Sequence, residues 1–235
     1  MASVSPAHEA EMSPDHLALL FDIDGTLIST GGAGAASWRL AFDELYGIPA
    51  DIGKFTDAGM TDSQVARRTF EAVVGHAPSR KELSVLLERR LNHLYETVAD
   101  STGYRVLPGV EKLLPRLLER GYLLGLVTGN GEAAAHIKLH RARLNRFFSF
   151  GGYGSDSDDR SELTKRALER AGLVFGEPID PKQCFTVGDT PLDVAAAHGA
   201  GIECVGVASG HFSAEQLREA GADHVLGSLE EPLPS

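Results

Sequence analysis

Short, uninterrupted apolar runs, each ending in polar or glycine residues, constrain the fold of this chain more than any other feature. In chain order they are 17–21 (LALLF), 123–129 (LLGLVTG), 147–152 (FFSFGG), 184–189 (CFTVGD), 203–210 (ECVGVASG) and the shorter 224–226. Runs of this length suit strands that are buried on both faces, as in a parallel sheet. From residue 104 onward, amphipathic helical patterns such as the leucine-rich stretch 110–120 separate them. This alternation predicts a doubly wound, Rossmann-like parallel α/β sheet.

Residues 29–103 interrupt the alternation. The glycine-rich stretch GGAGAA follows the first run, and no strong strand pattern appears before residue 104. The stretch instead contains three helical patterns, at 37–46, 62–74 and 80–100. We therefore predict a helical cap domain at 29–103, inserted into a core domain made of 17–28 and 104–235. Residues 1–16 are small, polar and acidic, and we expect them to form a disordered tail.

The charge balance excludes some classes of partner. The chain has 33 acidic and 22 basic residues, for a net charge of −11. Nucleic acids and anionic membrane surfaces are bound by clustered Lys and Arg, so we expect neither as a partner. No apolar run approaches the roughly 18–20 residues that span a bilayer. A small phosphorylated substrate remains compatible, because its binding is local.

The N-terminus and the cysteines indicate the compartment. The first residues, MASVSPAHEAEMSPDH, contain neither the basic region nor the apolar region of an export signal. Cys184 and Cys204 both lie in strand-like runs and are too few for a disulfide framework. We expect buried thiols in a reducing, cytoplasmic setting. The sequence leaves the choice between a monomer and a homodimer open.

Polar residues end three of the predicted strands. Asp22 and Asp24 follow the first strand, Thr128 ends the second, and Asp189 ends the run at 184–189. In an open α/β sheet, ligands bind beyond the carboxyl ends of the strands, so these side chains should meet at one edge. Three carboxylates gathered there repel one another unless a cation lies among them. An all-oxygen cluster of this kind suits Mg²⁺.

The segment DIDGT places two carboxylates two residues apart, so that both can reach one small site. The pair can then divide the chemistry, with Asp22 as the nucleophile and Asp24 as the proton donor and acceptor. The alternative interpretation is a solvated turn. The preceding buried strand and the following Gly-Thr argue against that alternative.

Two further segments fit the same edge. In VTGN, Thr128 can bind a phosphoryl oxygen, and the backbone N–H groups of Gly129 and Asn130 can point at an anion from the start of a helix. In VGDTPLD, Asp189 can complete the metal site, while Asp193 opens the next helix and is better placed to orient the ligands than to bind the metal. A helix N-cap at the threonine, and two capping aspartates without a metal, remain the alternatives.

Together, DIDGT, VTGN and GDTPLD, in this order, resemble the motifs of the haloacid dehalogenase superfamily. The chain looks most like its phosphoglycolate phosphatase and phosphomutase-like branch, which has a helical cap after the first motif. The resemblance implies that Asp22 attacks phosphorus to form an aspartyl-phosphate. It also implies that Asp24 protonates the leaving oxygen and later activates water, and that Mg²⁺ is held by the Asp22 carboxylate, the Asp24 backbone carbonyl and Asp189.

The chain departs from the family pattern at one point. The family has a lysine, often in a K-P-x-P run, between the threonine and the last acidic motif, and this chain has SDSDDRSELTKRALERAG at 155–172. Arg160 and Lys165 are the two candidates for this cation. We favour Arg160, because it lies at the loop edge of the active face and a guanidinium can bridge phosphate and carboxylate. We expect Lys165 to lie on a solvated helix face.

Related activities are disfavoured to different degrees. Dehalogenases of the family lack the second aspartate, which is present here as Asp24. Hexose-phosphate mutases have a cap histidine about four residues before a tryptophan, whereas Gly34 stands four residues before Trp38. Phosphonate hydrolases use a cap lysine, for which Lys54 and Lys81 are the candidates. A non-catalytic binding module would have lost an aspartate of the site. The prediction is therefore a hydrolase of a small phosphomonoester, phosphoglycolate-like or a sugar phosphate, with the mutase, the phosphonate hydrolase and the binding module as alternatives.

Overall fold

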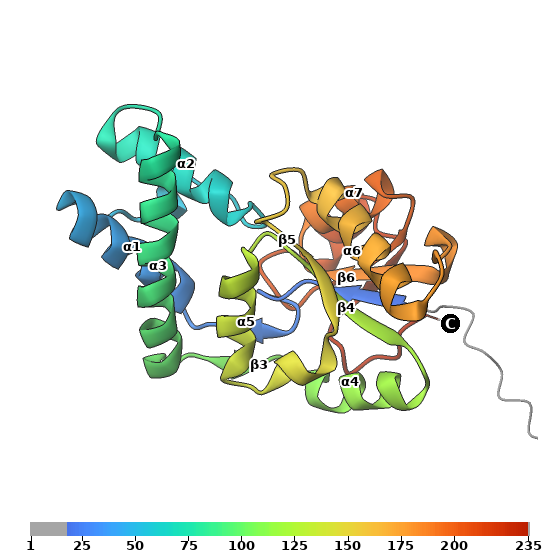
Figure 1. Ribbon diagram of the computed structural model, residues 1–235. Coiled ribbons are helices and arrows are strands. Elements are labelled where there is room, and N and C mark those ends of the chain that lie inside the picture. Colours follow the sequence, from blue (N-terminus) through green and yellow to red (C-terminus); the bar gives the residue numbers. More distant parts are fainter. Residues whose placement is uncertain (1–17, 235) are drawn as a thin grey trace, which may run out of the picture.

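A computed structural model describes residues 18–234, so the tail predicted at 1–16 lies outside the described residues. Its main feature is a six-stranded sheet in which every pairing is parallel, with strand order β5-β4-β1-β6-β7-β8 (Figure 1). The strands are β1 (Ala18–Phe21), β4 (Leu123–Thr128), β5 (Phe150–Tyr153), β6 (Cys184–Gly188), β7 (Glu203–Val207) and β8 (His224–Leu226). The parallel α/β fold expected from the apolar runs is confirmed.

Helices cover both faces of this sheet. They are α4 (Val110–Glu119), α5 (Glu132–His140), α6 (Arg160–Phe175), α7 (Pro191–Gly199) and α8 (Ala214–Glu219), with 3₁₀ turns at Leu144–Phe147 and Pro181–Gln183. Alternate residues of β1 belong to different apolar clusters. Leu19 packs in the cluster that includes residues of α4 and α5, and Leu20 packs in the cluster that includes residues of α6. The two-sided burial explains why the strands are continuously apolar.

One strand begins later than its apolar run predicts. The run starts at residue 147, but residues 144–147 form a 3₁₀ turn and β5 starts only at Phe150. Gly151 and Gly152 lie inside this strand because the neighbouring chain leaves no room for side chains. A Cβ on Gly152 would lie 1.9 Å from the carbonyl oxygen of Leu163 in α6.

Between β1 and β4 the chain forms a separate group of helices, seen at the left of Figure 1. They are α1 (Ala33–Tyr46), α2 (Asp62–Val74) and α3 (Arg80–Asp100), with a 3₁₀ turn at Ile52–Lys54. Trp38, Phe42, Phe70 and Leu86 belong to an apolar cluster of this helical group. Two of the helices follow the sequence prediction closely, and α1 begins four residues earlier than the predicted start at residue 37.

The helical group is joined to the sheet by a short antiparallel pair that the sequence analysis did not predict. β2 (Ile28–Ser29) pairs with β3 (Arg105–Val106), one on each side of the helices. Beyond this pair the two connecting segments stay close, since a Cβ on Gly31 would lie 2.3 Å from the carbonyl carbon of Gly103. Gly31 also has a positive φ of 62°, a conformation that glycine adopts readily.

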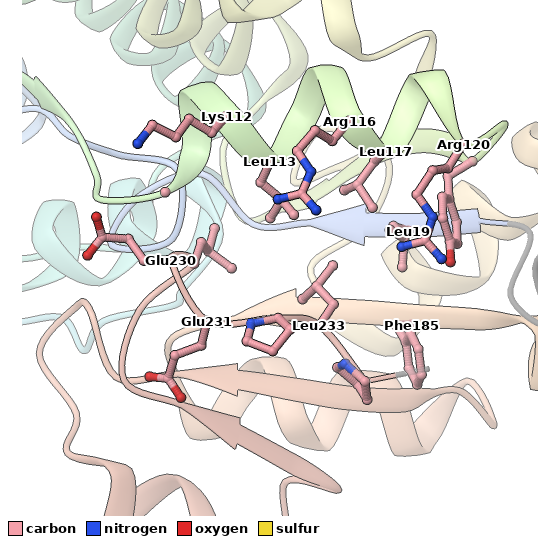
Figure 2. A pocket seen from close by; sticks show the side chains of 15 residues that line it. Leu19, Lys112, Leu113, Arg116, Leu117, Arg120, Phe185, Glu230, Glu231 and Leu233 are labelled. Atoms are coloured by element: carbon pink, nitrogen blue, oxygen red, sulfur yellow. The ribbon is translucent and has the colours of Figure 1, made fainter.

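The molecule has a large hollow at each end of the sheet. One, of about 560 Å³, lies between α4 and residues 229–234, at the amino ends of the strands. Figure 2 shows Leu19 and Phe185 on the strands, with Arg116 of α4 and Arg120, the residue after α4, on the helix side. The second, of about 520 Å³, lies at the carboxyl ends. Only the second is lined by the aspartates singled out in the sequence, so it is the candidate active site.

Two further expectations concern membrane-spanning helices and the cysteines. None of the helices between residues 18 and 234 combines the length and the apolar character needed to cross a bilayer. Cys184 and Cys204 are both buried and unpaired, as expected for structural thiols.

Candidate active site

The cavity at the carboxyl edge gathers most of the residues predicted for the site. Its lining includes Asp22, Asp24, Thr128, Gly129, Asn130, Arg160 and Asp189. Asp193 lies just behind it, in contact with Arg160. Lys165 is not part of the lining. The convergence follows from the parallel topology, which brings the ends of β1, β4 and β6 side by side.

Asp22 is held at the centre of this site. It directly follows β1, and its backbone N–H donates to the carbonyl oxygen of Val187 on β6 at 2.9 Å. The residue is 7% exposed. Burial raises the pKa of its carboxyl well above the ordinary value. The Asp193 and Asp189 carboxylates raise this pKa further, while Arg160 opposes the shift. A carboxylate here needs positive charge nearby.

Three carboxylates form a compact buried cluster. Oxygens of Asp22, Asp189 and Asp193 all lie within 4.8 Å of one another. Burial and the nearby Asp193 raise the pKa of Asp189 to about 7. The backbone surrounds Asp189 closely, because a Cβ on Gly25 or Gly210 would lie 2.3 or 1.7 Å from its Oδ2. The cluster therefore has the donor chemistry and the excess negative charge that fit a divalent cation.

The hydrogen bonds separate Asp193 from the other two. Its Oδ1 contacts the Arg160 guanidinium, and its Oδ2 accepts from the Thr190 N–H at 3.0 Å and hydroxyl at 2.7 Å. Between residues 18 and 234, the Asp189 carboxylate accepts a single side-chain hydrogen bond, from the Thr26 hydroxyl at 3.3 Å. Asp22 and Asp189 thus have oxygens available for a metal. The arrangement agrees with an orienting role for Asp193. This residue lies in the first turn of α7, where it forms a capping box with Thr190, the N-cap.

The Asp24 side chain points away from this cluster. Its Oδ2 accepts hydrogen bonds from Lys138 Nζ at 2.6 Å and from Asn130 Nδ2 at 2.8 Å. Burial alone would raise the pKa of the Asp24 carboxyl, but the Lys138 charge and these two hydrogen bonds outweigh it and lower the pKa. The family pattern implies that the metal contact of Asp24 comes from its backbone carbonyl, and the bonds to Oδ2 are compatible with that.

Thr128 and the start of α5 form the next wall of the site. The Thr128 hydroxyl is fully buried and accepts from Asn130 Nδ2 at 2.8 Å. The N-cap of α5 is Gly131, so the interpretation of Thr128 as a simple helix cap is wrong. The Gly131 N–H already donates to the carboxylate of Asp62, at 2.8 Å. A carboxylate from α2 therefore occupies one of the anion positions at this helix terminus.

Arg160, the first residue of α6, reaches into the cluster. Its Nη2 contacts Asp193 and lies 3.7 Å from Asp22 Oδ1, while its Nη1 donates to the carbonyl oxygen of Gly59 at 2.8 Å. Its buried Nε has no hydrogen-bond partner among the described residues. Lys165 instead pairs with Glu162 at 2.8 Å on the exposed face of α6. The geometry therefore favours Arg160 over Lys165 as the cation beside Asp22.

Sequence reasoning missed three residues that shape this site. Lys138 reaches it from α5, and Asp62 and Arg90 reach it from the helical group. Arg90 Nη1 pairs with Asp62 Oδ2 at 3.2 Å, and its guanidinium lies over the Trp38 ring at 5.0 Å. The only signal for Lys138 was a lone lysine in the helix EAAAHIKLH, whose other polar residues are one glutamate and two histidines. No local pattern marked Asp62, because an aspartate at a helix start is ordinary.

Comparison with known proteins agrees with this geometry. The family model for haloacid dehalogenase-like hydrolases matches residues 19–207. A phosphoglycolate phosphatase of Pseudomonas putida is 28% identical over 221 residues, covering 92% of this chain and 78% of that protein. A phosphoglycolate phosphatase of Escherichia coli O157:H7 is 25% identical over 236 residues, covering 92% of this chain and 90% of that protein.

Solved structures show the same fold. A β-phosphoglucomutase of Clostridium difficile superposes with a TM-score of 0.72 at 21% identity, covering 91% of this chain and 92% of that one. A predicted phosphoglycolate phosphatase of Haemophilus somnus superposes with a TM-score of 0.71, also at 21% identity, covering 92% of this chain and 95% of that one.

The chain belongs to the haloacid dehalogenase-like hydrolases. Within that family it is a phosphatase-type enzyme, as its relatives and its aspartate pair indicate. The substrate of such an enzyme is a small phosphorylated compound.

Proposed function

We propose that this enzyme hydrolyses phosphomonoesters of small metabolites, phosphoglycolate-like or sugar phosphates, through an aspartyl-phosphate on Asp22. The observation that carries the proposal is the placement of Asp22. It is a buried carboxylate beside Arg160 and Asp189, with Asp24 two residues further on. This is the arrangement that in-line attack on a phosphoryl group requires, because positioning and charge neutralisation supply most of the catalysis.

In the first step, a carboxylate oxygen of Asp22 attacks phosphorus, and the bond between phosphorus and the ester oxygen breaks. Asp24 gives its proton to the leaving oxygen, which departs as an alcohol. Thr128 and the Gly129 and Asn130 N–H groups lie where they can bind the phosphoryl oxygens. Arg160 balances the negative charge on the phosphoryl oxygens beside Asp22.

In the second step, water attacks phosphorus and the bond to Asp22 breaks. Asp24, now ionised, accepts the proton of the water, and inorganic phosphate leaves. The Asp22 carboxylate is regenerated. The sum is one ester and one water converted to one alcohol and one phosphate, with the proton returned to Asp24 for the next cycle.

We propose Mg²⁺ as the cofactor. The carboxylates of Asp22 and Asp189, with the Asp24 backbone carbonyl, would hold it, and Asp193 would orient Arg160 beside it. Bound there, Mg²⁺ would supply positive charge against the phosphoryl oxygens. The support is the chemistry of the donors, all of them oxygen, and the burial and mutual proximity of these carboxyl groups, which raise the pKa values of Asp22 and Asp189.

We propose residues 29–103 as the cap over this site, with 17–28 and 104–235 as the core. Two contacts support this. The Arg160 Nη1 donates to the Gly59 carbonyl, and the Asp62 N–H donates to the Gly129 carbonyl at 2.8 Å. A Cβ on Gly129 would lie 2.5 Å from the Met60 carbonyl oxygen, so the loop before α2 lies directly on the phosphate-binding turn. Such a cover excludes water during formation of the phosphoenzyme.

Other residues that line the cavity could bind an acidic or hydroxyl-bearing group of the substrate. Arg105 pairs through its backbone with β2 and lines the cavity, and its side chain forms no hydrogen bond or ion pair with the described residues. Ser29 and Thr30 are close by in the same lining. An unpaired guanidinium can bind a substrate carboxylate, and the hydroxyls can bind those of a sugar.

The mutase and phosphonate alternatives find less support. Gly34, at the position of the mutase histidine, lies next to the site without a side chain, since a Cβ there would be 3.8 Å from Lys138 Nζ. Lys54 and Lys81 are both exposed and neither lines the cavity, so neither is placed to form a Schiff base with a substrate. The two buried thiols support the cytoplasmic setting, and whether the enzyme is a monomer or a homodimer remains a prediction.

A panel of phosphomonoesters tests the proposed function. The panel contains p-nitrophenyl phosphate, phosphoglycolate, sugar phosphates and nucleotides, each with and without Mg²⁺. We expect phosphate release from small substrates in Mg²⁺, with phosphoglycolate or a sugar phosphate ahead of the nucleotides. No release from any member would reject the proposal. Conversion of one sugar phosphate to its isomer without phosphate release would favour the mutase instead.

Replacing Arg160 tests the cation beside Asp22. Arg160→Ala should lose about tenfold to a hundredfold in kcat/KM, the scale of removing one charge-stabilising donor. Arg160→Lys should recover only part, because an ammonium lacks the planar pair of donors that now bridges Asp193 and Gly59. Lys165→Ala is the matched control and should be nearly silent. A silent Arg160→Ala together with an inactive Lys165→Ala would reverse the assignment.

A further inference from the structure

Lys138 is a buried lysine that takes no direct part in the proposed transfer of the phosphoryl group or the proton. It lies in the second turn of α5, and its side chain is 7% exposed. Burying an ammonium is costly unless the charge is paired and hydrogen-bonded, so lysines in helices usually extend into water. This lysine instead extends into the active-site cavity. Its Nζ has two partners, Asp24 Oδ2 and Asn130 Oδ1, each at 2.6 Å.

These bonds determine the orientation of the Asn130 amide. Because the ammonium can only donate, the Asn130 oxygen must face Lys138, and the amide nitrogen must face the other way. That nitrogen donates to Asp24 Oδ2 and to the Thr128 hydroxyl, both at 2.8 Å. Lys138, Asp24, Asn130 and Thr128 therefore form one closed network, which joins the proton-transfer residue to the phosphate-binding turn.

The network leaves the two oxygens of Asp24 unequal. Oδ2 accepts from both Lys138 and Asn130, whereas Oδ1 has no hydrogen-bond partner among the described residues. A carboxylate fixed through one oxygen can exchange a proton only through the other. Asp24 is 41% exposed at its side chain, so packing alone does not fix its rotamer.

We propose that Lys138 is a positioning residue for proton transfer. It anchors Asp24 through Oδ2 and so aims Oδ1 at the leaving oxygen and then at the attacking water. The inference rests on the proposed function, since it assigns Asp24 the proton of that reaction. Lys138 forms no bond to the substrate in this role and exchanges no proton itself. Besides the effect of its charge on Asp24, Lys138 makes a geometric contribution that is the same in both steps.

The role predicts a specific kinetic pattern. Lys138→Met keeps the length and linearity of the side chain but removes both hydrogen bonds. With p-nitrophenyl phosphate and Mg²⁺, kcat should fall by about tenfold to a hundredfold. The fall is at most comparable to the contribution of general acid–base catalysis, about a hundredfold or more, because Asp24 itself is still present. KM should stay within about twofold, because ground-state binding of the phosphoryl group does not use Lys138. Lys182→Met, on an exposed 3₁₀ turn, is the matched control and should leave both constants unchanged.

Chemical rescue separates positioning from general structural support. In Lys138→Ala, the missing ammonium can be replaced by ethylammonium diffusing into the vacated space, and kcat should rise with its concentration and saturate. Wild type and Lys182→Met should not respond. If Lys138→Met fails to fold, judged by circular dichroism, Lys138→Gln keeps one donor and replaces it in the comparison.

Three outcomes would overturn the proposal. One is a Lys138→Met variant with kcat within about twofold of wild type, and another is a variant whose loss falls on KM alone, which would make Lys138 a substrate-binding residue. The third is a loss of kcat that ethylammonium does not restore in Lys138→Ala, which would indicate structural support only. A wild type that hydrolyses no phosphomonoester would instead reject the proposed function, and the two failures are thereby distinguished.

Discussion

Asp22→Asn should abolish turnover, with a fall in kcat of at least about a thousandfold, the scale seen when a catalytic nucleophile is lost. The amide has the shape of the carboxylate but lacks the oxyanion that attacks phosphorus. In the wild type, rapid acid quenching followed by mass spectrometry of the peptide that contains Asp22 should reveal one added phosphoryl group. The variant should show none.

The same substitution should stabilise the metal-free protein. The pKa of the Asp22 carboxyl is raised in the folded state, chiefly by burial and by the Asp193 carboxylate. A folded state that binds the proton more tightly than the unfolded state loses stability as pH rises above the unfolded value near 4. A neutral asparagine removes that loss, so in EDTA at pH 7.5 the Tm of Asp22→Asn should exceed that of the wild type.

Retention of most of the wild-type activity by Asp22→Asn would end the covalent mechanism. Asp24→Asn is the informative companion, because it should also be severely impaired. It keeps Asp22 and removes only the group that exchanges protons with the leaving oxygen and water. If phosphoenzyme still forms in Asp24→Asn on an activated ester such as p-nitrophenyl phosphate, the two roles are separated.

The sequence was sufficient for the sheet and for the part of the site that the sheet positions. Asp22, Thr128 and Asp189 follow buried strands, and the ends of parallel strands meet at one edge whatever the loops do. The choice of Arg160 over Lys165 rested on the same reasoning, since the start of a helix after β5 faces that edge. These inferences needed only local patterns and one rule of topology.

The other residues of the site, and the shortest strands, depend on tertiary contacts. Lys138 lies in α5, 8 residues after Asn130, and nothing in EAAAHIKLH shows that this lysine faces inward rather than into water. Asp62 meets Gly131 across an interface between segments 69 positions apart in the chain. The strands β2 and β3 have two residues each, too short for any periodicity to reveal. Such features depend on three-dimensional packing, which cannot be predicted from the patterns of a single sequence.

The acidic residues are grouped differently from the sequence prediction, in which the carboxylates of Asp22, Asp24 and Asp189 converge. The buried cluster consists of Asp22, Asp189 and Asp193, and the Asp24 carboxylate belongs to the Lys138 network instead. Spacing of two residues along an extended chain placed Asp22 and Asp24 on one side. The turn at Gly25 and the amine of Lys138 then separated their carboxylates. In the proposed mechanism, this division leaves Asp22 to react with the phosphoryl group and Asp24 to transfer the proton.

Removal of divalent metal should eliminate activity. After dialysis against EDTA, phosphate release should fall to the background rate, and it should return when Mg²⁺ is added in excess. The physical reason is that Asp22 must be ionised to attack phosphorus, yet its carboxyl group is buried beside Asp189, with Arg160 directed mainly at Asp193. Without a divalent cation, an incoming phosphate dianion meets negative charge rather than positive.

Metal binding should be visible without any turnover and should depend on pH. Burial and Asp193 raise the pKa of Asp189 to about 7, so below that pH a proton competes with the metal for this carboxylate. Mg²⁺ should therefore raise the Tm more at pH 8 than at pH 5.5. Asp189→Asn should lose most of this increase, whereas Lys182→Met should keep it. Full activity in exhaustively chelated protein, or a Tm that Mg²⁺ leaves unchanged at pH 8, would show that the aspartate cluster is not a metal site and that Arg160 alone balances the phosphoryl charge.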